Sequence, residues 1–227
     1  EIGKGLRITG AYGKSGALQT LDDYGSLAEG LLALYQATGE SEWLAFAGLL
    51  IDVAVQHFSD GQGGFFDTAD DADALITRPS DPGDNAEPSG WFAIAMACLT
   101  YSALTGLGEY REIAERALAV ATPLAARAPR AAGWGLAAAC AMEAGPLEVA
   151  VVGDPLAEDT RALLAVVRGA TSPGTVLAFG WDSDMPLLRD RPLLDGQPTA
   201  YVCRGFVCQQ PTANPSALAT QLAAVRR

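Results

Sequence analysis

Residues 38–43 read Thr-Gly-Glu-Ser-Glu-Trp, and residues 105–110 repeat this pattern as Thr-Gly-Leu-Gly-Glu-Tyr. In each copy, an alanine-rich and mostly uncharged segment with helical spacing of its apolar residues comes before the turn. A more charged segment with the same spacing follows the turn. Each copy therefore predicts an αα-hairpin, in which the first helix is inner and buried and the second is outer with one face in water.

The hairpins extend outward from these two turns. Thr20 and Asp23 form a predicted capping box at the start of the first helix, and Ser41 is the predicted cap of the second. The expected helices lie at residues 21–38, 41–58, 91–104 and 109–127, with a third inner helix from residue 133 to about 142 that has no outer partner. Because one hairpin cannot bury its apolar faces alone, such units stack into an open solenoid or a closed ring.

The pattern changes after Gly145. A β-branched run at residues 148–152, a helix at 156–168 and a second apolar run at 175–179 predict a βαβ unit. A further strand is expected at Tyr201–Cys203, and a last helix from about Ser216. We therefore expect a mainly α chain with an αα-hairpin domain at 1–145 and a small α/β unit at 146–227.

Charge and composition limit the function. The 227 residues carry a net charge of −12, which argues against nucleic acid and anionic membranes because both bind basic surfaces. No run of about 18 apolar residues is present, and four cysteines are too few for a disulfide scaffold. A reducing, cytoplasmic location is the expectation, and the start at Glu1 indicates a piece of a longer protein.

The segment from Phe58 to Gly90 interrupts the helices and is rich in acidic residues, glycines and aromatic residues. Residues 63–68 and 75–78 are expected to pair as a β-hairpin with an acidic tip at Asp70, Asp71 and Asp73. The tip lacks the alternating ligand spacing of calcium loops, so we predict no metal and no cofactor there. Long loops between regular elements carry function more often than the elements do.

Several stretches together resemble one known family. They are Leu21–Tyr35 (LDDYGSLAEGLLALY), Gly63–Thr68 (GGFFDT), Arg78–Asp81 with Glu87–Gly90, and Asp195–Arg204 (DGQPTAYVCR) with Cys208. They are similar to the C-terminal part of the thioredoxin-domain-containing proteins related to spermatogenesis-associated protein 20. The resemblance implies a partial (α/α)6 toroid, similar to N-acylglucosamine 2-epimerases and six-hairpin glycosidases. It also implies a parent chain with a thioredoxin-like domain and further hairpins.

Two positions depart from the family pattern. Trp91 stands where the family usually has asparagine after Pro-Ser-Gly, and Asn85 stands where it usually has glycine. Epimerases of the related barrel use histidines for proton transfer, whereas His57 lies near the end of an outer helix. That position favours a structural histidine and weakens the epimerase interpretation.

Carboxylates and aromatic rings of the loop and the first helix are the candidate site residues. Glycoside cleavage needs two carboxyl groups, and aromatic rings can stack on sugar faces. The candidate catalytic residues are Asp22, Asp23, Asp67, Asp81, Asp84 and Glu87, and the candidate substrate-binding residues are Tyr24, Phe65, Phe66, Arg78 and Trp91. The structural alternative is that the aspartates of the tip are solvated, Asp23 is a helix cap and Arg78 belongs to a structural ion pair.

Two further motifs have structural and functional interpretations. Cys203 and Cys208 are ordinary thiols at a strand and turn, or else a disulfide or redox switch; their spacing does not fit zinc. Cys98 and Cys140 are predicted core residues. The sequence Gly153-Asp154-Pro155 after a strand is interpreted as a tight turn, since it matches no nucleotide-binding motif.

Three functions follow from these patterns. The first is a carbohydrate-handling domain, which if catalytic would be a sugar epimerase or glycoside hydrolase. The second is a non-catalytic helical scaffold that binds a protein partner or its own thioredoxin-like domain, and the third is a redox role for Cys203 and Cys208. An open edge of inner helices would be apolar, so a homo-oligomer is also expected.

Overall fold

The structure is a computed structural model that describes residues 20–72, 76–170, 173–181 and 185–224. Its helices are α1 (Leu21–Thr38), α2 (Ser41–Phe58), α3 (Gly90–Thr105), α4 (Gly108–Leu118), α5 (Ala121–Arg127), α6 (Gly133–Ala144), α7 (Glu158–Arg168) and α8 (Pro215–Ala224), with a 3-10 turn at Pro129–Ala131. Its strands are β1 (Leu147–Val152), β2 (Thr175–Gly180), β3 (Thr199–Arg204) and β4 (Val207–Cys208).

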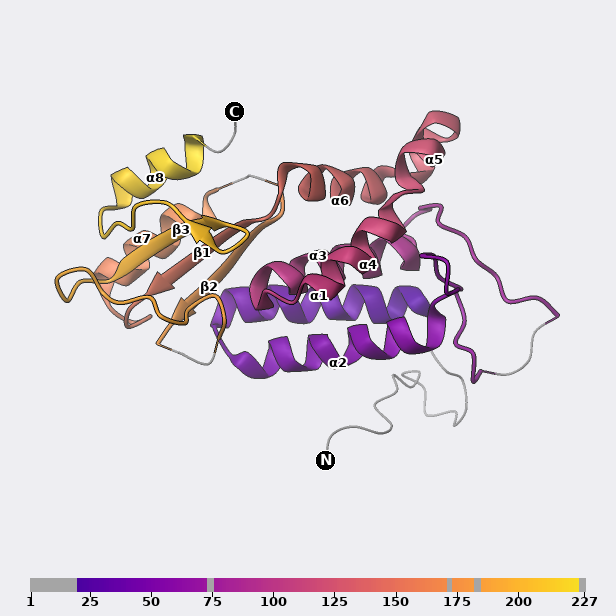
Figure 1. The fold of residues 1–227 in the computed structure, drawn as a ribbon, viewed down its shortest axis with the longest axis horizontal. Helices are drawn as coiled ribbons and strands as arrows, with labels where there is room; N and C mark the ends of the chain where they lie inside the picture. Colours follow the sequence, from indigo (N-terminus) through magenta and orange to yellow (C-terminus); the bar gives the residue numbers. More distant parts are fainter. Residues whose placement is uncertain (1–19, 73–75, 171–172, 182–184, 225–227) are drawn as a thin grey trace.

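Both predicted αα-hairpins are present, and the first helix of each packs against the other hairpin, but α1 keeps an exposed face where burial was predicted. α1 and α3 pack along each other, α2 and α4 lie on the outside, and α6 lies beside α3 (Figure 1). α3 is buried on nearly all sides, as its uncharged sequence predicts. Gly39 and Gly106 end α1 and α3 in the left-handed conformation, at φ 78° and 76°. The repeated Thr-Gly pattern therefore marks the two hairpin turns.

Three predicted helix boundaries are wrong, one of them the start of α7, which begins at Glu158 rather than at residue 156. The N-cap of α2 is Glu40 rather than Ser41, which is the first helical residue. The single helix expected at 109–127 is two helices, separated at Ala119 and Val120. Pro123 explains the break, because a proline has no N–H to donate and its ring clashes with the carbonyl four residues earlier.

The N-terminal ends of α1 and α3 approach each other closely through two glycines. A Cβ atom on Gly25 would lie 2.7 Å from the Cβ of Ala93, and one on Gly90 would lie 2.5 Å from the backbone nitrogen of Asp22. No larger residue fits at either position without moving a helix. This contact fixes where the first turns of α1 and α3 lie, and therefore where their side chains meet the loop at 59–89.

The sheet has the order β2-β1-β3-β4 in the described residues, with β2 parallel and β3 antiparallel to β1. β1 and β2 with α7 form the predicted βαβ unit. Side chains alternate between the two faces: Ala150 and Val152 join the core of the helical hairpins, whereas Val149 and Val151 pack with α7 and α8. The sheet is therefore a middle layer, buried on both faces.

The C-terminal end of α1 contacts the sheet. Gln36 accepts a hydrogen bond from the backbone N–H of Leu177 in β2 at 3.0 Å, and Arg168 donates to the carbonyl of Ala37 at 3.1 Å. The ring of Phe179 lies over Gly39, where a Cβ atom would approach it to 3.3 Å. The helical hairpins and the sheet thus share one hydrophobic core.

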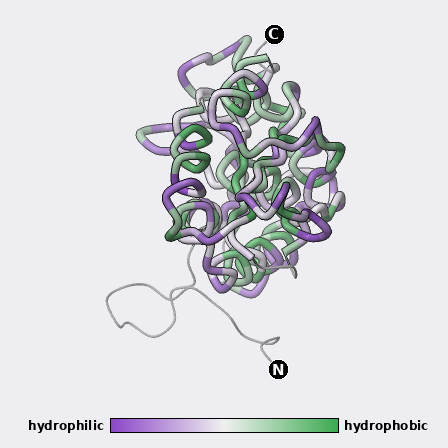
Figure 2. The backbone as a smooth tube through the Cα atoms, turned by 90° about the vertical axis from the view of Figure 1, so that its left-hand side faces the viewer, coloured by the Kyte–Doolittle hydropathy of each residue, from purple (hydrophilic) through white to green (hydrophobic). Residues whose placement is uncertain are grey.

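Polarity follows this layering. In the end-on view of Figure 2, hydrophobic segments gather in the middle of the molecule and hydrophilic ones lie mostly at its edge. Within the described ranges, every helix is too short or too polar to cross a bilayer.

The glycine contact predicts a difference between two alanine substitutions in α1. Gly25→Ala should lower the free energy of unfolding by roughly 1–3 kcal/mol, because overpacking outweighs the gain in helix propensity. Gly30→Ala is the matched control, since nothing lies within 4 Å of a Cβ atom there, and it should stabilise by about 0.5–1 kcal/mol. Urea denaturation measures both; equal effects would contradict the close helix approach.

Candidate functional site

The acidic segment folds back on α2 and does not form the predicted β-hairpin. Asp60 accepts hydrogen bonds from the N–H groups of Gln62 and Gly64, at 2.7 and 2.9 Å, and this turn pairs Phe65 with Ser59 as an isolated bridge. Residues 63–68 and 76–78 contain no paired strands, although the N–H of Asp67 donates to the carbonyl of Pro79 at 2.8 Å. Asp73 and Leu75 lie outside the described residues.

This path carries the segment across the N-terminal ends of α1 and α3, at the end of the molecule opposite the sheet (Figure 1). The N–H of Leu21 donates to the carbonyl of Asp67 at 3.0 Å, which joins α1 to the loop. A groove of about 250 Å³ opens at this junction. Four of the six predicted catalytic carboxylates line it: Asp22, Asp67, Asp81 and Glu87.

The pKa of Asp67 is raised by its surroundings in the groove. Burial raises its pKa, the N–H of Asp81 lowers it by donating to the Asp67 carboxylate at 3.4 Å, and repulsion from the carboxylates of Asp81 and Asp22 raises it again. A carboxyl group that is partly buried beside two other acids holds its proton to higher pH. Neighbouring acids with different affinities for a proton can serve as donor and acceptor in one reaction.

The other two predicted catalytic residues hold the structure around the groove. Asp23 accepts hydrogen bonds from the N–H and the hydroxyl of Thr20, at 3.0 and 3.1 Å, and so completes the predicted capping box. Asp84 accepts from the N–H of Ser89 at 3.0 Å and from the N–H of Trp134 at 2.7 Å. It therefore ties the loop to the first turns of both α3 and α6.

The predicted substrate-binding residues lie in the packing around the loop. Tyr24 and Phe65 are buried, and Trp91 packs edge-on against Phe65 while its indole N–H donates to the carbonyl of Ala117 at 2.8 Å. The guanidinium of Arg78 lies 4.1 Å from the ring centre of Phe66, and it donates to the carbonyls of His57 and Thr68. None of these five residues lines the groove.

Glu29 and Trp134 were not predicted as site residues. Burial raises the pKa of Glu29 to about 7, and a hydrogen bond from the Trp134 side chain offsets part of that rise. Glu29 follows Asp22 by seven residues, or two helical turns, so both lie on one face of α1. That spacing is visible in the sequence, but the partner on α6 is not.

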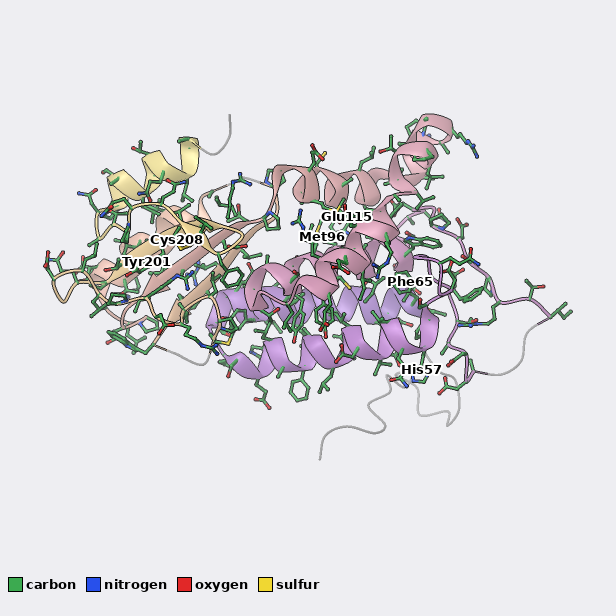
Figure 3. All side chains as sticks on the ribbon, in the orientation of Figure 1. His57, Phe65, Met96, Glu115, Tyr201 and Cys208 are labelled. Atoms are coloured by element: carbon green, nitrogen blue, oxygen red, sulfur yellow. A yellow bond between two sulfur atoms is a disulfide. The ribbon has the colours of Figure 1, made fainter. Side chains whose placement is uncertain are left out.

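One group of side chains in the described residues has the geometry for a cation. His57, Asp70 and Asp71 place their ligand atoms within 4.8 Å of one another, and Nδ1 of His57 lies 2.7 Å from Asp70. Both aspartates are exposed and have other partners. The cluster is explained as an ion pair at the end of α2, where Figure 3 shows His57 close to the loop.

The four cysteines have different outcomes: the pair takes one of its two predicted states, Cys98 is confirmed as a core residue, and the prediction for Cys140 is wrong. Cys203 and Cys208 form a disulfide instead of two separate thiols, because β3 and β4 pair them directly across the hairpin. Cys98 is buried as predicted, whereas Cys140 is exposed on α6. Asp154 accepts a hydrogen bond from the N–H of Leu156 at 2.9 Å, as expected for a tight turn after β1.

Comparison with known proteins gives one consistent set of relatives. The chain is 32% identical to human spermatogenesis-associated protein 20 and 31% identical to the rat protein, over 208 residues or 87% of this chain. It is 28% identical over 198 residues to an uncharacterized protein of Caenorhabditis elegans. The chain spans about a quarter of the length of these relatives, 26% in each case. No family model matches the sequence.

The pKa of Glu29 predicts a pH-dependent stability. The pKa of Glu29 in the folded chain, about 7, exceeds its ordinary value of 4.5. Between pH 4.5 and pH 7, the folded chain therefore binds more protons than the unfolded chain. The free energy of unfolding should therefore fall as pH rises through this window. Glu29→Gln should remove that contribution and be more stable than the wild type at pH 8, by on the order of 1–3 kcal/mol.

Urea denaturation of both proteins at pH 4.5 and pH 8 measures the difference. The raised pKa of Asp67 also makes stability fall with rising pH. The pH dependence of the Glu29→Gln variant is therefore compared with that of the wild type, and is not expected to be zero. Parallel dependences would show that Glu29 has an ordinary pKa.

Proposed function

We propose that this chain is a carbohydrate-handling domain of the six-hairpin type, which binds an uncharged or amine-bearing sugar in the groove at the N-terminal ends of α1 and α3. The observation that carries the proposal is the convergence of Asp22, Asp67, Asp81 and Glu87 on that groove, from one helix and two parts of the loop. Several carboxylates around one groove can accept hydrogen bonds from successive sugar hydroxyls.

The charge of the groove restricts the ligand class. Among the residues that the structure describes, the lining holds four carboxylates and no lysine, arginine or histidine. The four carboxylates would repel a phosphate or carboxylate group on a ligand bound in the groove. Neutral sugars, N-acyl amino sugars and free amino sugars fit this electrostatic environment, whereas sugar phosphates do not.

The same groups provide an acid and a base. Asp67 retains its proton to higher pH, so it is the candidate general acid for a leaving oxygen. Asp22 lies on the rigid first turn of α1 and is the candidate carboxylate for activating water or stabilising positive charge. Of the aromatic residues expected to stack on the sugar, Tyr24 and Phe65 are buried in the core and Phe66 and Trp91 do not line the groove, so hydrogen bonds supply the recognition.

The helix arrangement supports a partial toroid. α1 and α3 begin at the same end of the molecule, and Asp84 brings the first turn of α6 to that end as well. Inner helices with aligned N-terminal ends would surround a common mouth if further hairpins continued the ring. The groove would then lie on the rim of that mouth.

A helical scaffold is the second candidate. Leu27 and Leu34 are 46% and 44% exposed, and their seven-residue spacing puts them on one face of α1. An uncovered apolar face on an inner helix fits a further hairpin of a longer chain, a protein partner or a second copy. If the groove binds no sugar, this face favours the scaffold function, and gel filtration would report self-association.

A thermal-shift screen tests the carbohydrate proposal. A sugar at 100 times its Kd should add about 2.7 kcal/mol to the free energy of unfolding, which raises Tm by roughly 5–10 °C for a chain of this size. Neutral and N-acyl amino sugars should produce hits, and sugar phosphates should not.

Two variants and one control locate the binding. Asp22→Asn and Asp67→Asn should each abolish the shift, because each removes a carboxylate of the groove. Glu42→Gln changes an exposed acid in the first turn of α2 and should keep it. A shift that persists in both groove variants, or a screen without hits, would contradict the proposal.

A further inference from the structure

The β3–β4 hairpin, at the other end of the molecule, is closed by the Cys203–Cys208 disulfide. Its turn consists of Gly205 and Phe206, both with positive φ, at 55° and 63°. Two-residue turns of this hand match the twist of the flanking strands. The hairpin is therefore well formed by its backbone, and the cysteines are direct cross-strand neighbours.

Other contacts also hold this turn in place. The buried carboxylate of Glu148 accepts hydrogen bonds from the N–H groups of Gly205 and Phe206, at 3.1 and 2.6 Å. The ring of Phe206 lies against Gly106 at the end of α3, where a Cβ atom would approach it to 3.0 Å. Because the disulfide closes only a short loop, it restricts little chain entropy. The two sulfurs would therefore stay close if the bond opened.

Arg191 is placed beside both sulfur atoms. Its Nη2 lies 3.6 Å from Sγ of Cys203 and 3.4 Å from Sγ of Cys208. A divalent sulfur is a weak acceptor, and the buried Nε of Arg191 has no partner among the described residues. Burial lowers the pKa of Arg191, and the nearby carboxylates of Glu148 and Asp190 offset part of that effect. A thiolate on either sulfur would add a negative charge directly beside the guanidinium, which a neutral disulfide does not.

Access to the two sulfurs is unequal. Cys203 is 1% exposed, whereas Cys208 is only partly buried and lines a groove of about 410 Å³ together with Arg191, Tyr201 and Phe206. Figure 3 shows Cys208 close to Tyr201 at the sheet end of the molecule. An incoming nucleophile from this groove would meet Cys208 first.

We propose that Cys203 and Cys208 form a thiol–disulfide exchange site, whose substrate is an external dithiol that enters the groove beside Arg191. A thiolate of the dithiol attacks Sγ of Cys208, the Cys203–Cys208 bond breaks, and its electron pair leaves on Sγ of Cys203. Arg191 stabilises that thiolate until it takes up a proton.

The second half of the exchange completes the balance. The second thiol of the reductant loses its proton and attacks the reductant's first sulfur, which is bonded to Cys208 in the mixed disulfide. The bond to Cys208 breaks, and Cys208 takes up a proton and leaves as a thiol. The dithiol has then been oxidised to a disulfide, and two electrons and two protons have passed to the cysteine pair. Since Glu148 keeps the turn in place, an external disulfide can drive the reaction in reverse.

Dithiothreitol is the probe for the first test, with the full chain carrying Cys140→Ser to remove the exposed free thiol. The reduction is carried out at pH 7 in native buffer. Alkylation followed by mass spectrometry then measures the fraction of chains in which the Cys203–Cys208 disulfide has been reduced. Arg191→Gln should slow the opening about tenfold, because the leaving thiolate loses its cation, and Arg191→Lys should restore most of the rate. A circular-dichroism melt checks that each variant is folded.

A second test identifies the attacked sulfur and does not depend on Arg191. Each single variant leaves one cysteine of the pair to react with oxidised glutathione. The Cys203→Ser variant, which keeps the partly exposed Cys208, should form the adduct at least about tenfold faster than the Cys208→Ser variant, which keeps the buried Cys203, because burial slows the exchange. Equal adduct rates would overturn the assignment. A disulfide that opens only in unfolding concentrations of urea, or opens equally fast in folded Arg191→Gln, would overturn the exchange site.

Discussion

The close approach of α1 and α3 at Gly25 and Gly90 is the constraint on which the candidate site depends. Because neither glycine leaves room for a Cβ atom, the first turns of the two helices lie against each other. The loop at 59–89 crosses that junction and brings Asp67 and Asp81 to Asp22. Three acids from different parts of the chain are thereby held close together although their charges repel one another. The packing of the helices offsets the free-energy cost of that repulsion.

At each end of the helical layer, a carboxylate helps to hold a loop against the helices by accepting hydrogen bonds from backbone N–H groups. At the N-terminal end, Asp84 joins the loop to α3 and α6. At the C-terminal end, Glu148 holds the β3–β4 turn against the end of α3. α3 is buried between these two ends and contacts both. The carboxylate groove and the cysteine pair therefore depend on the same helix while lying at opposite ends of the molecule.

The sequence predicts the local features well and the long-range contacts poorly. Helical periodicity, the Thr20–Asp23 capping box and the Thr-Gly turns depend on neighbouring residues, and all of them are present. The break before Pro123 was missed although proline signals it. The cap that Asp84 provides for Trp134, 50 residues away, has no local signal. The disulfide also depends on strand pairing, since a spacing of five fits a turn, a hairpin or a helix equally well.

The pKa of Asp67 is the most direct measure of the packed carboxylate groove. Carbon-13 NMR of the aspartate carboxyl groups can follow its titration in the wild type and in Asp22→Asn. The close approach of α1, α3 and the loop predicts a wild-type pKa above the ordinary 3.8, and a lower value once the Asp22 charge is removed. An Asp67 pKa at or below 3.8 that does not respond to Asp22→Asn would contradict the assembly of these acids in one groove.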